Sequence, residues 1–356
     1  MTDINEQRNL LSESVAKLFR DMMADGLPES DAAALAQGQL PAALWRRVEQ
    51  HGIVATLVPE SAGGFGGNWL DACVVLGHAG YHAVPLPIAE TLLAQRLLVE
   101  AGIDLPEGAI AIAAEAGAQL RRDGDGWRLD GHASAVPWGN AAPHCAVVCH
   151  HQGGMHIALV AANAITAMDN SCTVAREPVA DLHFNNSPVR AAGACKSDVF
   201  ALCTLLRVAQ IGGALNRALH QSVQYANERN QFGKPIAKFQ AIQHSLALLA
   251  DEAAAVNCAA LAACRAADLG DAGFEIAAAK LRANRAIGAA TSIAHQVHGA
   301  IGFTREHTLH RVTQRLWSWR SQFGNDRFWA MQLGSMVAQR GARNLWPDLT
   351  GRSDRS

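Results

Sequence analysis

The feature that most constrains the fold of this chain is a short break between two long apolar patterns. Before the break, apolar residues recur every three or four positions, which predicts a long amphipathic helix that ends near Arg229. Gly233 and Pro235 stop that helix, and a second apolar helical pattern begins at Ile242. The break therefore predicts the tip of a helical hairpin, which displays its side chains. The apolar residues before the break are Leu202, Leu205, Leu206, Ala209, Gly213, Leu219, Val223 and Ala226.

The pattern of the chain changes twice along its 356 residues. Residues 1–108 show helical periodicity, around 4–19, 41–52, 69–82 and 87–102. Residues 109–195 hold short apolar segments bounded by Gly, Asp, Asn and Pro, which predicts a small antiparallel sheet. Residues 196–356 are helical again to about 343, and we expect the tail 348–356 to be frayed. We therefore expect an α+β multidomain fold: an N-terminal all-α domain, a middle antiparallel β domain and a C-terminal four-helix bundle.

A glycine-rich run at 63–67 raises the question of nucleotide binding. It lacks the preceding strand, the G-x-G-x-x-G spacing and the later acidic residue of a dinucleotide fingerprint. We interpret it as a flexible turn.

Composition excludes several classes of function. Charged residues make up 17% of the chain and the formal net charge is −2, with no basic run longer than two residues, which argues against nucleic acid. Eight cysteines without Cys-x-x-Cys pairs fit a reducing cytosol. The N-terminus has no signal-peptide pattern and no apolar run approaches membrane length, so we expect a cytoplasmic protein without a membrane contact. Four histidines between 295 and 310 lack a known ligand spacing, so we expect no metal site.

Three ordered motifs together resemble the acyl-CoA dehydrogenase family. They are the hairpin-tip segment 229–236 with 239–244, the glycine-rich segment 59–67, and the segment 296–307. The resemblance implies an FAD cofactor, an acyl-CoA substrate and an electron-transferring flavoprotein as electron acceptor. It also implies an oligomer, because the contacts are made to an FAD held mostly by another subunit. The residues that would meet this FAD are Arg229, Gln231, Phe232, Gln296, Gly299 and Ala300.

The chain departs from the family pattern at the catalytic base. Phe323 stands where the family usually carries a glutamate, and Cys203 and Thr204 occupy the alternative position on the helix before the hairpin tip. Desaturating an acyl thioester needs a base for the proton beside the carbonyl, and none of these side chains supplies a carboxylate. Asp326 and Glu306 are the remaining candidates; an N-cap role for Asp326 and a structural role for Glu306 are the simpler alternatives.

The segments that usually contact the flavin ring and the thioester also depart from the family pattern. The corresponding pieces here are 135–140 and 111–117. Loss of these segments together with the base resembles the short subunit of two-component α2β2 acyl-CoA dehydrogenases of bacterial steroid side-chain degradation. There a longer subunit supplies the glutamate and most of the flavin pocket. Two alternatives stay open: a self-sufficient homotetrameric dehydrogenase with an unusual base, and a structural partner that binds no flavin.

Overall fold

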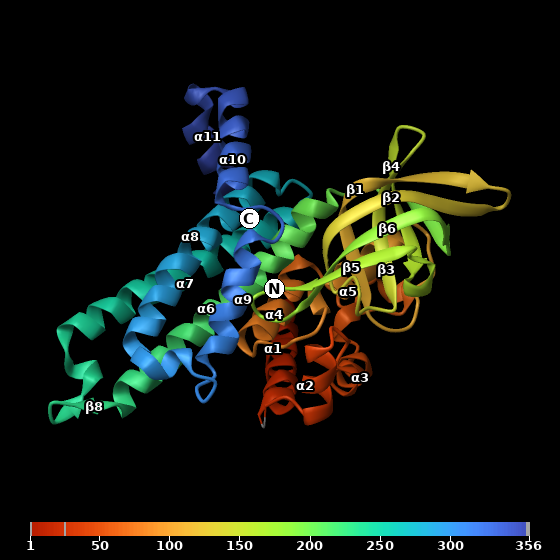
Figure 1. Cartoon of the computed structure of the whole chain (residues 1–356). Coiled ribbons are helices and arrows are strands. Elements are labelled where there is room, and N and C mark those ends of the chain that lie inside the picture. Colours follow the sequence, from red (N-terminus) through yellow and green to blue (C-terminus); the bar gives the residue numbers. More distant parts are fainter. Residues whose placement is uncertain (1, 25, 354–356) are drawn as a thin grey trace.

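The computed structural model describes residues 2–24 and 26–353. Figure 1 shows the N-terminal helices, a twisted sheet on one side of the molecule, and the helices of the C-terminal part on the other. The last two helices project away from the rest. This arrangement confirms the predicted α+β fold.

The N-terminal part is built from five helices, and it contains all four of the predicted helical segments. The short, alanine-rich helix α2 was not predicted from periodicity. Helix α4 begins with a capping box, in which Asn68 accepts from the Asp71 N–H and Asp71 accepts from the Asn68 N–H. The helices are α1 Thr2–Met23, α2 Glu29–Ala36, α3 Ala42–His51, α4 Trp69–Tyr81 and α5 Ile88–Glu100.

The glycine-rich run forms a tightly packed turn. It follows a single 3-10 turn, Glu60–Ala62, and Gly63 and Gly66 have positive φ angles of 82° and 63°. A Cβ atom on Gly64 would lie 2.2 Å from the Val58 carbonyl oxygen. The prediction of a turn is confirmed, and its backbone packs directly on its neighbour at Gly64, while flexibility stays a prediction.

The middle part is a seven-stranded sheet in the order β5-β6-β2-β1-β3-β4-β7. The short apolar segments that predict strands are 109–114, 127–129, 145–149, 156–160 and 179–184; all of them form strands, although the first begins one residue before β1, and β5 and β7 are additional. All neighbouring pairs are antiparallel except β1 and β3, which run parallel. The connection at 138–143 produces this parallel pair, because it carries the chain across the end of β1 to its other edge. The strands are β1 Ile110–Asp123, β2 Gly126–Pro137, β3 His144–His151, β4 Gly154–Ala161, β5 Ala167–Cys172, β6 Pro178–Val189 and β7 Ala191–Ala194.

Four helices follow the sheet, and the glycine-containing segments 233–235, 270–273 and 299–302, which predict breaks between helices, mark the connections between them. Helix α6 is the centre of the molecule, because it contacts α4, α7, α8 and α9. Its approach to α4 requires glycine: a Cβ on Gly213 would lie 1.8 Å from the Gly77 carbonyl oxygen. The helices are α6 Val199–Glu228, α7 Gln240–Asp268, α8 Gly273–His298 and α9 Leu309–Ser321.

The C-terminal end is more ordered than expected. Helix α10 spans Asp326–Arg340 and helix α11 spans Leu345–Ser353, so the frayed tail predicted from 348 onward is helical as far as 353. Residues 354–356 lie outside the described part of the chain. Figure 1 shows α10 and α11 projecting beyond the bundle.

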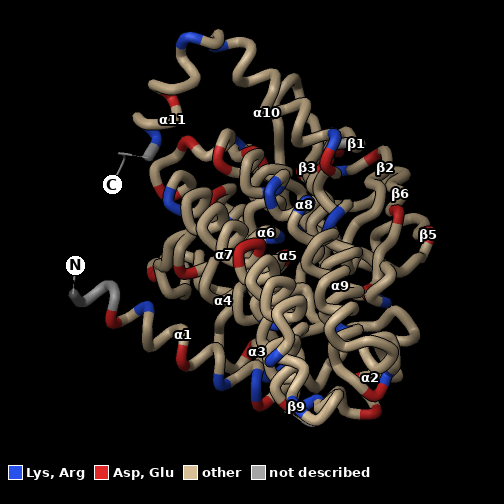
Figure 2. The backbone as a smooth tube through the Cα atoms, turned by 90° about the vertical axis from the view of Figure 1, so that its left-hand side faces the viewer, with Lys and Arg blue, Asp and Glu red and all other residues tan. Residues whose placement is uncertain are grey.

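Two helices are long and apolar enough to cross a membrane by length and composition, although no unbroken apolar run in the sequence suggested it. Their most apolar windows have mean hydropathies of 1.4 in α6 and 1.5 in α7. The α6 window is 78% buried, so core packing explains its composition, whereas the α7 window is 28% buried. Figure 2 shows positive and negative residues interspersed along the visible side of the backbone.

Candidate functional site

The tip of the α6–α7 helical hairpin is a small β-hairpin with a two-residue loop. Helix α6 ends at Glu228, and β8 (Asn230–Gln231) pairs with β9 (Lys234–Pro235). The turn residues Phe232 and Gly233 have φ angles of 52° and 77°, the left-handed backbone that two-residue hairpins require. A phenylalanine in this conformation is strained, and strain of this kind concentrates at functional sites.

The side chains at the tip point away from the chain's own core. Phe232 is 92% exposed, and its only recorded ring contact is an edge-on one with Phe239, with centroids 6.2 Å apart. Arg229 and Gln231 are also exposed. The Arg229 side chain makes no hydrogen bond or ion pair with any residue that the structure describes. The simpler interpretation of Arg229, that its guanidinium binds the carbonyl groups at the C-terminal end of α6, is therefore not seen among the described residues.

A second set of predicted contact residues lies at the end of α8. Gln296 is exposed on its last turn, and Gly299 ends the helix with φ 61° and ψ −144°, a backbone open essentially only to glycine. Ala300 is exposed in the 3-10 segment that follows. Within the described residues, no hydrogen bond joins this set to the hairpin tip, so the chain presents two separate exposed groups.

The two positions where the family carries a base lie next to each other. Thr204 Oγ1 donates to the Phe323 carbonyl oxygen at 3.4 Å, and Trp329 Nε1 donates to the same oxygen at 2.8 Å. Neighbouring Cys203 is fully buried, and burial raises the pKa of its thiol far above the ordinary value. The structure thus brings both base positions together without a carboxylate at either of them.

Neither substitute carboxylate faces these positions as a free base. Asp326 accepts from Arg320 at 2.9 Å and is the first residue of α10. The N-cap is Asn325, whose Oδ1 accepts from the Phe328 N–H, so the predicted N-cap role of Asp326 is wrong by one residue. Glu306 is exposed before the start of α9. Because α9 is 13 residues long, about 20 Å of helix lies between Asp326 and Glu306.

The segment that replaces the flavin-ring contact has an unusual backbone. Ala135 and Trp138 both have positive φ angles, 50° and 62°. Trp138 is 3% exposed, so its ring belongs to the core and offers no surface to a ligand. The backbone N–H of Trp138 donates to the Pro178 carbonyl, and this bond anchors the turn after β2 to the start of β6.

A buried charge network next to the base positions was missed by sequence reasoning. Arg207 donates to Glu90 at 2.5 Å and to Gln210, and its guanidinium lies over the rings of Trp319 and Phe323. Arg207 and Glu90 are 4% and 3% exposed. The one available signal was an arginine inside the apolar stretch of α6, but its partner lies 117 positions away in sequence.

Two further buried cations lie close to this network. Arg315 donates to Glu177 at 2.9 Å, and both side chains are buried. Lys280 is fully buried, and its Nζ donates to the Trp319 carbonyl at 2.6 Å near the end of α9. Burial lowers the pKa of Lys280 well below the ordinary value. These contacts hold the C-terminal end of α9, just before Phe323.

The neighbouring histidines pack as aromatic rings. His298 stacks on Tyr225 and His295 on Phe303, with ring centroids 4.7 and 4.2 Å apart. Burial lowers the pKa of both histidines. In the residues covered by the structure, no group of three His, Cys, Asp or Glu side chains is arranged to hold a metal ion.

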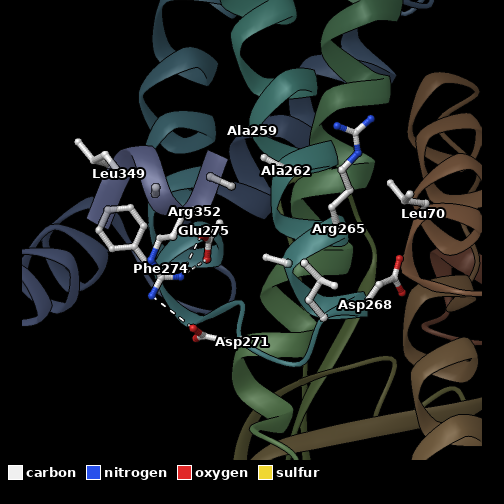
Figure 3. Close-up of a pocket in the computed structure, with 14 residues that line it drawn as sticks. Leu70, Ala259, Ala262, Arg265, Asp268, Asp271, Phe274, Glu275, Leu349 and Arg352 are labelled. Atoms are coloured by element: carbon white, nitrogen blue, oxygen red, sulfur yellow. Dashed lines mark hydrogen bonds and ion pairs between the residues drawn. The ribbon is translucent and has the colours of Figure 1, made fainter. Parts of the chain in front are cut away.

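Figure 3 shows a pocket of about 650 Å³ at the α7–α8 connection. Alanines of both helices line it, and Arg352 of α11 bridges to Glu275 at 3.0 Å and to Asp271 at 3.4 Å. None of the predicted flavin or base residues lines this pocket. It is therefore a separate feature of the fold.

Comparison with known proteins identifies the family. Residues 5–104 match the model of the acyl-CoA dehydrogenase N-terminal domain, and residues 200–333 match that of the C-terminal domain. The chain belongs to the acyl-CoA dehydrogenase family, whose members are generally FAD-binding oxidoreductases. The acyl-CoA dehydrogenase IpdE2 of Mycobacterium tuberculosis is 31% identical over 314 residues, which are 87% of this chain and 91% of that protein.

Three other similarities are informative. The acyl-CoA dehydrogenase FadE34 of Mycobacterium tuberculosis is 28% identical over 84% of this chain, but only 42% of FadE34 is covered. The Tcur3481-Tcur3483 steroid ACAD variant has a TM-score of 0.83 at 25% identity, covering 94% of this chain and 99% of that one. The ChsE4-ChsE5 complex of Mycobacterium tuberculosis has a TM-score of 0.84 at 23% identity, covering 94% and 98%, which shows the shared fold.

Proposed function

We propose that this chain is a subunit that completes an FAD site at the interface with a longer, catalytic acyl-CoA dehydrogenase subunit. The complex would dehydrogenate an acyl-CoA thioester between its α and β carbons. One observation carries the proposal: the chain exposes Arg229 at a strained hairpin tip, with no partner of its own. Its base positions at Phe323 and Thr204 lack a carboxylate.

The exposed groups fit what an FAD needs from a neighbouring subunit. Arg229 offers a planar guanidinium fork of the kind that phosphate prefers, with Gln231 and Phe232 beside it. Gln296 offers an amide, and Gly299 and Ala300 offer backbone without a bulky side chain. FAD would supply the hydride acceptor for the β carbon. The α proton would go to a glutamate of the longer subunit, and the electrons would pass to an electron-transferring flavoprotein.

The exposed side of α7 supports an oligomer. Its most apolar window is only 28% buried, and Leu248 and Leu261 are 45% and 42% exposed. A long apolar helix with one uncovered side is expected to meet another chain. We infer that this side lies against the longer subunit, and that the assembly is cytoplasmic.

The names of similar proteins suggest the substrate class. One similar structure is titled a steroid ACAD, and another is a complex of two differently named chains. FadE34 is more than twice as long as the segment it shares with this chain, which leaves space for a second unit of this kind. We therefore propose a steroid-derived acyl-CoA as substrate and a hetero-oligomer as the working form.

Two alternatives predict different results. A self-sufficient homotetramer would need Asp326 or Glu306 as its base, and Asp326 is engaged by Arg320. Asp326→Asn in a purified, active homotetramer tests this version, because unchanged turnover removes Asp326 from the role. A structural partner that binds no flavin would have no use for Arg229, so charge removal at the tip would leave flavin content unchanged.

The test is co-expression of this chain with a longer acyl-CoA dehydrogenase subunit, followed by measurement of flavin per complex. We expect Arg229→Gln to lower FAD retention about tenfold or more, because a charged hydrogen bond to the pyrophosphate is lost. Arg46→Gln is the matched control, since Arg46 is an exposed arginine on α3, away from both the tip and α7. Equal FAD retention in both variants would contradict the proposed role of the tip.

A further inference from the structure

A second pocket, of about 660 Å³, opens between helices α1, α4, α6 and α9, which converge in the middle of the molecule (Figure 1). Three of these helices each contribute one arginine: Arg20 from α1, Arg217 from α6 and Arg311 from α9. The volume suits a small organic ligand and exceeds what a simple inorganic ion needs. It shares no residue with the proposed flavin contacts.

The positive charge in this pocket is not neutralised by the protein. No aspartate or glutamate is among the described residues that line it, and none of the three arginines makes an ion pair with a described carboxylate. Elsewhere the less exposed arginines are paired, as Arg207 is with Glu90 and Arg315 with Glu177. A cleft lined by one sign of charge concentrates ions of the opposite sign.

The aromatic wall of the pocket holds its polar groups in place. The Arg217 guanidinium lies 5.3 Å from the centre of the Tyr81 ring, and the Tyr81 hydroxyl is 2.9 Å from His220 Nδ1. His82 lies beside these groups. Burial, together with the charges of Arg217, His78 and Arg20, lowers the pKa of His82 to about 4, so the charge at neutral pH is that of the arginines.

A buried amide provides an independent indication of a ligand. Gln221 lines the pocket, is 7% exposed and donates from Nε2 to Thr308 Oγ1 at 2.6 Å. Its Oε1 is buried without a partner. The two ends of an amide are assigned from the hydrogen-bond network, so the reverse orientation is equally consistent with the position. In that orientation Oε1 accepts from the Thr308 hydroxyl and the amide N–H₂ is free to donate to a bound anion.

We propose that this pocket binds a small phosphate ester through Arg20, Arg217 and Arg311, with Gln221 as an additional donor. Guanidinium groups from three helices surround a phosphate better than a single fork does, and each phosphate oxygen accepts charge-assisted hydrogen bonds. The site goes beyond the proposed dehydrogenase function, because none of the proposed flavin contacts is among the residues that line it. The phosphate could belong to a pyrophosphate or to the 3′-phosphate of coenzyme A.

The test is calorimetric titration of the purified protein, at low salt, with inorganic pyrophosphate, coenzyme A and 3′-dephospho-coenzyme A. We expect saturable binding that Arg217→Gln weakens about tenfold. Arg265→Gln should leave it unchanged, because Arg265 is an exposed arginine on α7 that does not line this pocket. Tighter binding of coenzyme A than of its dephospho form would place the 3′-phosphate in the pocket, and equal binding would place the pyrophosphate there. A bound anion should also raise the pKa of His82 in an NMR titration.

The absence of saturable binding for all three probes would overturn the proposal. Equal weakening in Arg217→Gln and Arg265→Gln would overturn it as well, because the effect would then be one of net charge. Arg20→Gln is the second pocket variant, since Arg20 is exposed on α1 and its replacement leaves the core intact. The experiment needs no flavin, so its outcome is independent of the proposed dehydrogenase role.

Discussion

At the scale of single residues, the buried charges explain why the region around Phe323 is a packed core. Glu90, Arg207 and Lys280 are each 4% exposed or less, and each has a hydrogen-bond partner. A buried ion pair contributes little over apolar packing, but a buried charge without its partner is costly. The identities of Glu90 and Arg207 are therefore tied to each other.

Arg207→Met tests this interdependence. It leaves the Glu90 carboxylate buried without its cation, so we expect the free energy of unfolding to fall by about 3–5 kcal/mol. Urea unfolding followed by circular dichroism measures the change. The double variant Glu90→Leu, Arg207→Met should recover most of the loss, because both charges are then absent. A loss below about 1 kcal/mol in the single variant would show that the pair is not structurally important.

At the scale of elements, the hairpin tip combines an exposed ring with a strained backbone. Phe232 has a φ angle of 52°. The next residue, Gly233, also has a left-handed backbone conformation, but a glycine adopts it at no steric cost. The turn would form more easily with glycine at both positions. We infer that the ring is retained for contact with another molecule.

A pair of variants separates the ring from the backbone. Phe232→Gly relieves the left-handed strain but raises the backbone entropy of the unfolded chain, and these effects oppose each other, so stability should change by no more than about 1 kcal/mol. Phe232→Ala keeps the strain and removes the ring. Both variants should lower the flavin content of the co-expressed complex. Wild-type flavin content in Phe232→Ala would mean that the ring makes no contact with the cofactor.

Element-scale features were the most predictable from sequence. The spacing of apolar residues and the positions of glycines predicted helices α4 to α9 and the tip of the α6–α7 hairpin, because these signals are local in sequence. The parallel β1–β3 pair was not predicted, since strand order depends on how the chain crosses the sheet. The Asn325 cap was missed by one residue for a similar reason: both Asn325 and Asp326 suit the position, and only the backbone geometry selects one of them.

At the scale of the whole molecule, the two sets of predicted flavin residues remain unconnected within one chain. The motifs predicted which residues are exposed. Whether the two sets of residues bind one FAD together depends on the surface of a second subunit. The network around Glu90 and Arg207 was out of reach, because tertiary packing alone brings α5 and α6 together. The cationic pocket likewise draws on four helices that are distant in sequence.

The buried histidines make stability depend on pH. The pKa of His82 falls from 6.5 to about 4 on folding, chiefly through burial. Between these values the unfolded chain binds a proton that the folded chain does not, so stability falls as pH drops from about 6.5 toward 4. For this one group the free energy of unfolding changes by at most about 1.4 kcal/mol per pH unit. Thermal unfolding at pH 7.5 and 5.0 measures it, and an unchanged slope in His82→Gln would contradict the assignment.

The central claim is that this chain cannot hold its flavin alone. The most direct measurement is the visible absorption spectrum of the protein purified alone, after FAD is added in excess and removed by gel filtration, with its mass from light scattering. We predict a colourless protein that becomes yellow only when it is co-purified with a longer acyl-CoA dehydrogenase subunit. Flavin retained on every chain of a homo-oligomer would contradict the claim, and the search for a base would return to Asp326 and Glu306.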